Sequence, residues 1–416
     1  MEKMGYGKRI ASFLAGIILP VCALAQPSLS VRFGGSAVCL DQREATIAGK
    51  TLDGTVMAGS FPVCPTFNAK IGWYDTSGSV FSSLYRQPQY GIGTSVEFLD
   101  LCRYTKTDRN AVSDRGGYLS NIYNIYGFVD RPMVRTDRMN FQYTLELGPG
   151  FSTGIWDPQT NVSNQVMGSV MTIHVGLGLE ALFALRDRSE VGVGLYYIHN
   201  SNGSTCLPNR GYNGIEIAAN YKINCRRRPV PAAAGALRDT SRARMALSPR
   251  TTYGKGFSID AYASGSMSAI TNEHYLEGCK GCPVYPRFAF GADVTYRYAR
   301  RFSSGVGVDV FWTPESLTAK LEEVNGALFE TEVDYAPVSV GLAAIQEFHY
   351  RNLSFRLGLG AYAYNRDGFN YRHLAYQTIA LRYYVPRAGN MFVGIGLKTH
   401  RFTMADCLQL TLGVRI

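Results

Sequence analysis

The sequence has no apolar run long enough to cross a bilayer as a helix. Its longest near-continuous apolar stretch, residues 13–25, is shorter than the roughly 20 residues that a spanning helix needs. It also lacks a basic run with interleaved aromatic side chains, although its formal net charge is +10. An α-helical membrane protein is therefore excluded, and nothing in the sequence indicates a nucleic-acid channel.

Motifs for metals and nucleotides are equally scarce. The Cys279-x-x-Cys282 pair has no second cysteine pair and no histidine ligands at zinc spacing, so a disulfide within a loop is the better interpretation. Glu273 and His274 lack the partner residues of a metalloprotease helix. Gly-x-Gly repeats recur with the period of a strand, and no helix follows them as in a nucleotide-binding loop. We therefore expect no cofactor and no bound metal.

What the sequence does contain is apolar and aromatic surface. Hydrophobic residues make up 46% of the 416 residues, with 27 Tyr and 21 Phe, which excludes a disordered chain. The mean hydropathy is nevertheless −0.07, close to neutral. A chain reaches such a value by alternating apolar with polar residues rather than by grouping them.

Residues 1–25 have the features of a secretory signal peptide. Lys3, Lys8 and Arg9 precede an apolar segment, and Ala-Leu-Ala at 23–25 forms a small-x-small cleavage site. Export with removal of this segment leaves eight cysteines, an even number that permits disulfides. They are Cys39, Cys64, Cys102, Cys206, Cys225, Cys279, Cys282 and Cys407.

Strict alternation is the clearest pattern in the chain. In residues 140–148, Phe141, Tyr143, Leu145 and Leu147 share one face, and small or polar residues occupy the other. The same division recurs in residues 174–185, 191–199, 288–298, 355–362, 393–401 and 408–416. Strands of a soluble sandwich average about 5–6 residues, whereas these segments run to about 9–15 residues, as strands tilted across a membrane do. The pattern favours an all-β fold, a transmembrane antiparallel β-barrel, over a soluble β-sandwich.

The last strand fits this interpretation. Leu408, Leu410, Leu412, Val414 and Ile416 alternate to the end of the sequence. This resembles the C-terminal strand that the barrel-assembly machinery of the bacterial outer membrane recognises. Such strands usually end in an aromatic residue, and isoleucine departs from that pattern.

Two tandem halves flank an aperiodic segment. Residues 226–250 are rich in arginine and lack any periodicity, which predicts a basic linker. The halves 26–225 and 251–416 resemble each other in their last four strands, best where Val-Gly-Val-Gly-Leu at 191–195 matches Val-Gly-Ile-Gly-Leu at 393–397. The alternatives are two eight-stranded barrels or one larger barrel of about 14–16 strands.

One polar segment between two membrane-type strands stands out. It begins with His-Asn-Ser-Asn at 199–202 and continues to Pro208 and Asn209. A His-x-Ser-Asn motif followed by Pro-Asn at this interval resembles the signature of the outer-membrane lipid A 3-O-deacylase family. The resemblance extends upstream over residues 65–225, and the C-terminal half is similar to the second half of longer, acyloxyacyl hydrolase-like members.

The resemblance implies an outer-membrane enzyme that removes an ester-linked acyl chain from lipid A, the membrane anchor of lipopolysaccharide. In such a carboxylic ester hydrolase, Ser201 would be the nucleophile and His199 its general base. Asn209 and the backbone amide of Gly203 would stabilise the oxyanion. The alternative is a non-catalytic outer-membrane barrel, serving as a pore, adhesin or structural protein, that keeps a degenerate form of the motif.

Strand parity supports this site independently. The alternation over 191–199 puts His199 on the apolar, membrane-facing side, and continuing it puts Ser201 there too. A titratable side chain at the lipid face is costly unless it has a task or lies at the headgroup boundary. Two residues apart on one strand, their Cα atoms are separated by about 7 Å. Slight bending then brings the side chains within hydrogen-bond range.

The group that orients the histidine is where the sequence departs from the family. A gapless alignment puts Asn213, not an acid, in the orienting position, and a three-residue insertion would bring Glu216 there instead. Parity favours Asn213 because it shares the lipid face, whereas Glu216 falls on the lumen face. An amide oxygen can accept the imidazole N–H and hold its tautomer, although it stabilises imidazolium less than a carboxylate does.

The remaining histidines are assigned to the lumen. His174 and Glu180 share a face with glycines and are interpreted as a polar interior pair. His400 also falls on the lumen side and no Ser-Asn follows it, so we expect no second active site in the C-terminal half. If both chain ends are periplasmic, the strand that ends at His199 is the seventh of eight. It then runs outward and places the site at the outer leaflet.

Overall fold

The computed structural model describes the strands and many of their connections. The described residues are 27–38, 45–47, 50–52, 63–77, 80–101, 119–157, 164, 166–185, 188–206, 209–225, 255–268, 285–314, 321–324, 327–330, 336–366, 373–386, 388–402 and 404–416. The predicted signal peptide, the predicted linker and the Cys279–Cys282 pair lie outside them and remain predictions.

The N-terminal half forms a closed antiparallel barrel of eight strands in the order β1-β10-β9-β8-β7-β6-β5-β4. The strands are β1 (Pro27–Val38), β4 (Val63–Tyr74), β5 (Gln89–Glu97), β6 (Ile122–Arg135), β7 (Met139–Ser152), β8 (Met171–Ala184), β9 (Ser189–Ser201) and β10 (Tyr212–Asn224). A short hairpin of β2 (Ala45–Ile47) and β3 (Lys50–Leu52), the helix α2 (Val80–Leu84) and the 3-10 helix η1 (Leu99–Leu101) lie between them. The strand that carries His199, β9, is the seventh strand of this barrel, as predicted.

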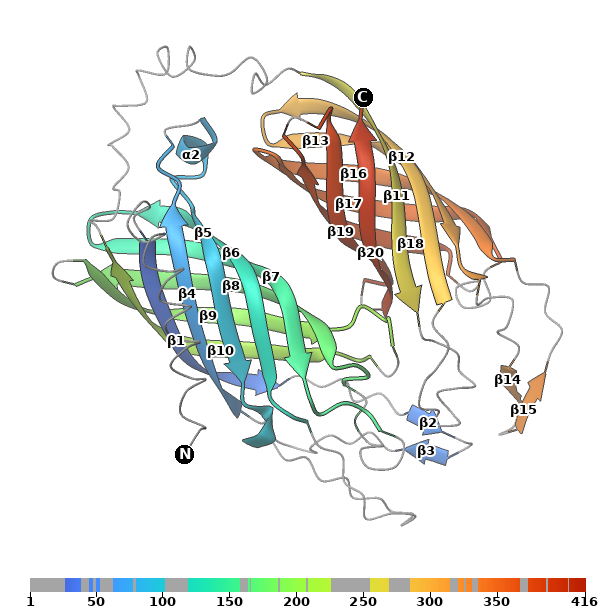
Figure 1. Cartoon of the computed structure of the whole chain (residues 1–416), viewed down its shortest axis with the longest axis horizontal. Helices are drawn as coiled ribbons and strands as arrows, with labels where there is room; N and C mark the ends of the chain where they lie inside the picture. The colour runs from blue at the N-terminus through green and yellow to red at the C-terminus, as the bar shows by residue number, and fades with distance from the viewer. Residues whose placement is uncertain are drawn as a thin grey trace, which may run out of the picture.

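The C-terminal half forms a second closed antiparallel barrel in the order β11-β12-β13-β16-β17-β18-β19-β20. Its strands are β11 (Gly256–Ser268), β12 (Tyr285–Ala299), β13 (Phe302–Trp312), β16 (Val338–Tyr350), β17 (Leu353–Asn365), β18 (Ala375–Tyr384), β19 (Met391–His400) and β20 (Met404–Arg415), with a small hairpin of β14 (Leu321–Val324) and β15 (Ala327–Glu330). Of the two predicted alternatives, two eight-stranded barrels are confirmed. Figure 1 shows the barrels next to each other.

Each barrel closes because its first strand pairs with its last. In the N-terminal barrel Leu29 of β1 pairs with Ile223 of β10, and in the C-terminal barrel Ala261 of β11 pairs with Val414 of β20. Both chain ends of a barrel therefore lie at one end of it, which we call the terminal end. The opposite end, where β9 leads into β10, is the loop end. Among the described residues, no helix has the length and apolar composition needed to span a bilayer.

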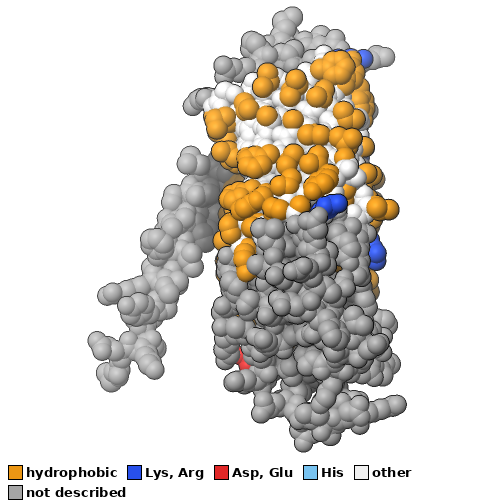
Figure 2. Space-filling model, turned by 90° about the vertical axis from the view of Figure 1, so that its right-hand side faces the viewer, with side chains coloured by type: hydrophobic (Ala, Val, Ile, Leu, Met, Phe, Trp, Pro, Cys, Tyr) orange, Lys and Arg blue, Asp and Glu red, His pale blue; other side chains and the backbone are white. Residues whose placement is uncertain are grey.

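The alternation sorts side chains between the outside and the lumen. Outward residues stay exposed although they are apolar, such as Phe33 at 60% and Ile217 at 70%. Figure 2 shows hydrophobic side chains spread over the viewer's face of the C-terminal barrel. Most of the buried, inward residues are polar or charged. An apolar outside with a polar inside is the arrangement of a barrel surrounded by lipid.

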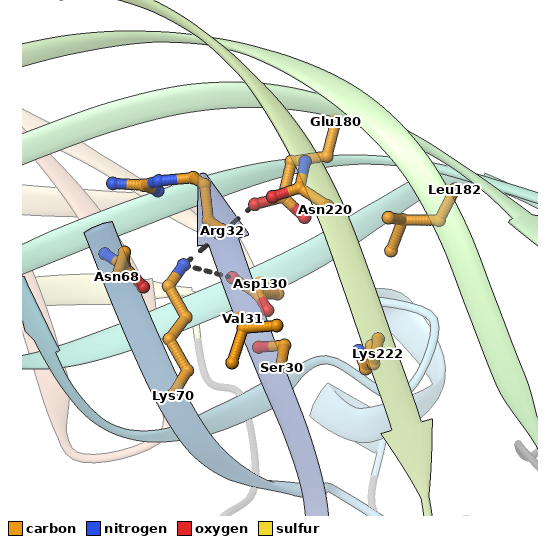
Figure 3. A pocket seen from close by; sticks show the side chains of 10 residues that line it. All are labelled: Ser30, Val31, Arg32, Asn68, Lys70, Asp130, Glu180, Leu182, Asn220 and Lys222. Carbon is orange, nitrogen blue, oxygen red and sulfur yellow. Dashed lines mark ion pairs between the residues drawn. The ribbon is translucent and has the colours of Figure 1, made fainter. Parts of the chain in front are cut away.

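The lumen of the N-terminal barrel is filled by paired charges. Lys70 and Arg32 both contact Glu146 Oε1, at 2.6 and 3.1 Å. A small pocket beside them, drawn in Figure 3, shows Lys70 also facing Asp130 at 3.7 Å and Glu180 at 4.0 Å. An eight-stranded barrel is just wide enough for side chains to fill. These ion pairs connect five strands across the interior.

Candidate active site

The predicted site residues meet at the loop end of the N-terminal barrel. The antiparallel register of β9 and β10 sets Asn213 directly opposite His199, and Ser201 is the last residue of β9. Pro208 lies outside the described residues. The other predicted site residues are described and lie on β9, on β10 or in the segment that joins them.

His199 bridges Ser201 and Asn213. Its Nε2 atom lies 2.8 Å from Ser201 Oγ, and its Nδ1 atom lies 2.8 Å from Asn213 Oδ1. Since an amide oxygen only accepts hydrogen bonds, the ring proton belongs on Nδ1 and Nε2 is left to accept the serine O–H. Ser201 is 8% exposed. Ser201, His199 and Asn213 thus form one hydrogen-bonded chain, the order in which a nucleophile, a base and an orienting group are arranged in serine hydrolases.

Glu216 lies away from this chain. It is buried in the lumen, where its Oε1 accepts a hydrogen bond from Thr66 Oγ1 at 2.6 Å and its Oε2 lies 3.3 Å from Arg32 Nη2. The register pairs Glu216 with Tyr196, whose side chain also points inward. The structure therefore brings His199 together with Asn213 and keeps Glu216 on the opposite side of the strand.

Tyr197 is a member of the site that the sequence analysis did not single out. Its hydroxyl donates to Asn213 Oδ1 at 2.7 Å, so this oxygen accepts two hydrogen bonds. Its ring is nearly parallel to that of His199, with 6.5 Å between centroids. The sequence signal that could have identified Tyr197 is its position two residues before His199, on the same face of β9. The two donors fix the orientation of the Asn213 amide.

A tight turn over residues 202–205, called the 202–205 turn below, follows the serine. Gly203 and Ser204 have φ angles of +61° and +67°, and the Thr205 N–H points to the Asn202 carbonyl at 3.3 Å. Two consecutive positive φ angles are typical of a type I′ turn, and glycine suits the first of them. The turn includes Gly203, whose backbone amide follows Ser201 by two residues in the sequence.

Asparagine side chains hold this turn in place. The Asn202 N–H donates to Asn209 Oδ1 at 3.0 Å. The Asn202 side chain donates to the Cys206 carbonyl at 2.8 Å and to Ser169 Oγ, which precedes β8, at 3.0 Å. Gly211 has a φ of +73°, and a Cβ there would lie 3.0 Å from the His199 ring. The segment is thus built against the histidine.

The lumen candidates have structural partners instead. His174 Nε2 lies 3.3 Å from Glu146 Oε2, and the ring stacks on Tyr126. Glu180 accepts hydrogen bonds from Gln142 at 2.7 Å and from Tyr196 at 3.0 Å. No cluster of three metal-ligating side chains occurs in the described part of the chain. Of the eight cysteines, Cys64 is disulfide-bonded.

Two family models match the chain, one for each barrel. Residues 68–222 match "Lipid A 3-O-deacylase (PagL)", and residues 257–416 match "Acyloxyacyl hydrolase, C-terminal domain". The chain belongs to the lipid A 3-O-deacylase family, in its two-domain form. The resemblance inferred from the His-x-Ser-Asn motif is confirmed. Among curated proteins, no sequence matches significantly.

Three solved structures show some similarity to this chain. Neisserial surface protein A has 9% identity and a TM-score of 0.27, over 47% of this chain and 96% of its own. The outer membrane enzyme PagL has 14% identity and a TM-score of 0.27, over 47% and 98%. The attachment invasion locus protein Ail of Yersinia pestis has 12% identity and a TM-score of 0.23, over 48% and 99%.

In this family member, the C-terminal barrel also contains a Ser-His hydrogen bond, between Ser303 Oγ and His349 Nε2 at 2.7 Å, but both side chains are buried inside the barrel rather than on its outward face. His400 is buried, and its Nε2 lies 2.9 Å from the Tyr362 hydroxyl. Its ring stacks on that of His373 with 4.2 Å between centroids. Lys398, two residues earlier, pairs with Asp406 at 2.7 Å. His400 is part of a polar lumen cluster.

Proposed function

We propose that the protein is a cofactor-free serine esterase of the bacterial outer membrane that removes an ester-linked acyl chain from lipid A. The single observation that carries this proposal is the hydrogen-bonded chain of Asn213, His199 and Ser201 on the outward face of the N-terminal barrel. The family match supplies the substrate class, an ester of lipid A at its 3-position. Membership of a family of outer-membrane barrels supplies the location.

The hydrogen bonds support a separate role for each group in this proposal. Ser201 Oγ attacks the ester carbonyl carbon while His199 Nε2 takes the hydroxyl proton. The tetrahedral intermediate collapses when His199 returns that proton to the departing sugar oxygen, which leaves an acyl-serine. A water molecule, deprotonated by His199, then hydrolyses the acyl-serine and releases the fatty acid. Asn213 holds the Nδ1 proton in place through both steps.

The negative charge that develops on the carbonyl oxygen of the tetrahedral intermediate needs hydrogen-bond donors to stabilise it. The Oδ1 atom of Asn209 already accepts the Asn202 N–H, so its Nδ2 group is the one that would donate to an oxyanion. The backbone amide of Gly203 is the second donor in this proposal. Fixed donors of this kind are worth about 10²–10³-fold each in rate in serine hydrolases.

The surroundings of the serine suit an acyl chain. In the register of β8 and β9, Ser201 pairs with Ile173 and His199 pairs with Val175. The outward neighbours further along these strands, Leu177 and Leu195, are also apolar and about half exposed. A lipid substrate in the surrounding membrane therefore reaches the nucleophile along an apolar surface, without leaving the bilayer.

The proposal is tested with the purified full chain and purified lipopolysaccharide in detergent micelles. We expect release of one hydroxy fatty acid per lipid A, without added metal or cofactor. A correctly folded protein that releases none favours the rival function, a non-catalytic barrel with a degenerate motif. Folding is checked by heat-modifiable migration on a gel, which reports an intact barrel.

The orientation of the site is a separate prediction. With both chain ends in the periplasm, reached after insertion by the barrel-assembly machinery, the loop end of the N-terminal barrel faces the outer leaflet, where lipid A resides. A Ser204→Cys substitution in a Cys206→Ser background should react with an impermeant maleimide on intact cells. Labelling only after permeabilisation would place the loop end in the periplasm.

The C-terminal barrel is expected to have no catalytic histidine. His400→Ala should leave the rate of deacylation unchanged, because His400 bonds to Tyr362 inside the lumen. Loss of this buried hydrogen bond should destabilise the barrel by about 1 kcal/mol, seen as a lower temperature of the heat-modifiable transition. A large fall in turnover with normal folding would contradict the assignment of a single site.

A further inference from the structure

The 202–205 turn packs directly against the C-terminal barrel. A Cβ added to Gly203 would lie 2.9 Å from Leu408 Cβ and 3.6 Å from Leu397 Cδ1. Leu397 of β19 and Leu408 of β20 are cross-strand partners near the loop end of their barrel. Gly203 is thus required twice, by its positive φ angle and by the close approach of the second barrel.

A second contact joins the barrels at their terminal ends. Asp75, which follows β4, is buried, and its carboxylate accepts hydrogen bonds from Arg351 at 3.1 Å and from the Tyr350 hydroxyl at 3.1 Å. Tyr85, which follows α2, lies edge-on to Tyr350 and donates to the His349 carbonyl at 3.0 Å. Figure 1 shows α2 projecting from the N-terminal barrel beside the other barrel.

Contacts at opposite ends fix two cylinders relative to each other more firmly than either alone. At the terminal end they are polar and directional, with a salt bridge of 3.1 Å between Arg351 and a carboxylate that is 1% exposed. At the loop end the contact is apolar and involves Gly203, the second residue of the 202–205 turn. The C-terminal barrel therefore holds a defined place beside the proposed site.

We propose that the C-terminal barrel completes the active site of the N-terminal barrel, with Leu408 as a positioning residue for the Gly203 amide. This rests on the proposed function. In the proposed mechanism Leu408 touches neither the ester nor the serine. It forms the surface against which the 202–205 turn packs. The barrel without a site of its own thus acts on the chemistry of its neighbour.

The physical reason lies in the tolerance of an oxyanion donor. A backbone amide must lie within about 2.7–3.1 Å of the developing charge, and a misplacement of about 1 Å can cost about 10²-fold in rate. The hydrogen bonds of Asn202 hold the first residue of the turn, whereas the contact with Leu408 falls on Gly203 itself. The Leu408 atom nearest Gly203 is Cβ, so Leu408→Gly removes it and leaves space into which the turn can relax.

The variant that tests this is Leu408→Gly, with Leu408→Ala, which keeps the Cβ, as the conservative replacement. We expect Leu408→Gly to lower kcat about tenfold while KM stays near the wild-type value, because the loss is in the transition state. Leu408→Ala should restore most of kcat. The matched control is Leu410→Gly, on the same face of β20 but 66% exposed, which should leave both constants unchanged.

A second readout separates this proposal from the identity of the substrate. A fluorophosphonate reacts at Ser201 through a charged phosphoryl oxygen in the same hole, with fluoride leaving and the proton going to His199. Leu408→Gly should slow this labelling about tenfold relative to wild type and Leu410→Gly. Equal labelling rates overturn the proposal, and so does a wild-type serine that does not react. Normal labelling without lipid A cleavage counts against the proposed function alone.

Discussion

Ser201→Ala and His199→Ala are each expected to reduce fatty acid release from lipopolysaccharide by at least about 10³-fold, and the double variant no further. The serine supplies the attacking oxygen, and without the imidazole 2.8 Å away its proton has no acceptor. Because the two act as one unit, their losses should not add. The measurement is the initial rate with purified, folded protein.

The control for this pair is Ser204→Ala. Ser204 lies three residues after Ser201 in the same turn but makes no contact with His199 in the described structure. Its substitution should leave the rate within a few-fold of wild type, with the small loss set by the positive φ angle at that position. A Ser201→Ala variant that still releases fatty acid at a substantial rate would mean that another nucleophile carries the reaction.

Asn213→Ala is expected to lower the rate by about 10²-fold or more, because the histidine loses the group that fixes its tautomer. Glu216→Ala should leave the rate of the folded enzyme nearly unchanged. It should instead destabilise the barrel, since Arg32 and Thr66 lose a buried partner. Asn213→Asp is the conservative companion and should retain activity, because a carboxylate can accept the same Nδ1 proton.

The opposite outcome has a definite meaning. If Glu216→Ala abolished deacylation and Asn213→Ala were nearly silent, the loop between β9 and β10 would carry an insertion relative to the family. The register that pairs Asn213 with His199 would then be wrong. Both variants are compared by heat-modifiable migration first, so that a loss of the barrel is not taken for a loss of chemistry.

Much of the fold could be predicted because the residues of each strand in a membrane barrel alternate between an apolar outside and a polar lumen. The alternation around Phe141, Val191 and Leu408 predicted strand positions and outward-facing sides that the structure confirms. Closure could not be predicted in the same way. Whether β10 pairs back with β1 or onward with β11 depends on the register at the strand edges, which local periodicity does not encode.

The candidate site could likewise be predicted only where strand alternation alone decides which face a residue occupies. Parity alone set His199, Ser201 and Asn213 on one face, since it needs only the count along each strand. The hydrogen bond from Tyr197 to Asn213 depends on which residues lie diagonally across two strands, and so on the register. The contact of Gly203 with Leu408 depends on how two barrels meet, which no pattern within either half records.

Mass spectrometry of lipid A from cells that express the full chain tests whether the protein removes an acyl chain from lipid A through Ser201. Cells with the wild-type protein should contain lipid A lighter by one hydroxyacyl chain than cells with the Ser201→Ala variant at equal levels in the outer membrane. We expect this single loss and no other change in the lipid A. An identical lipid A profile in the two strains, with wild-type protein folded and inserted, would contradict it.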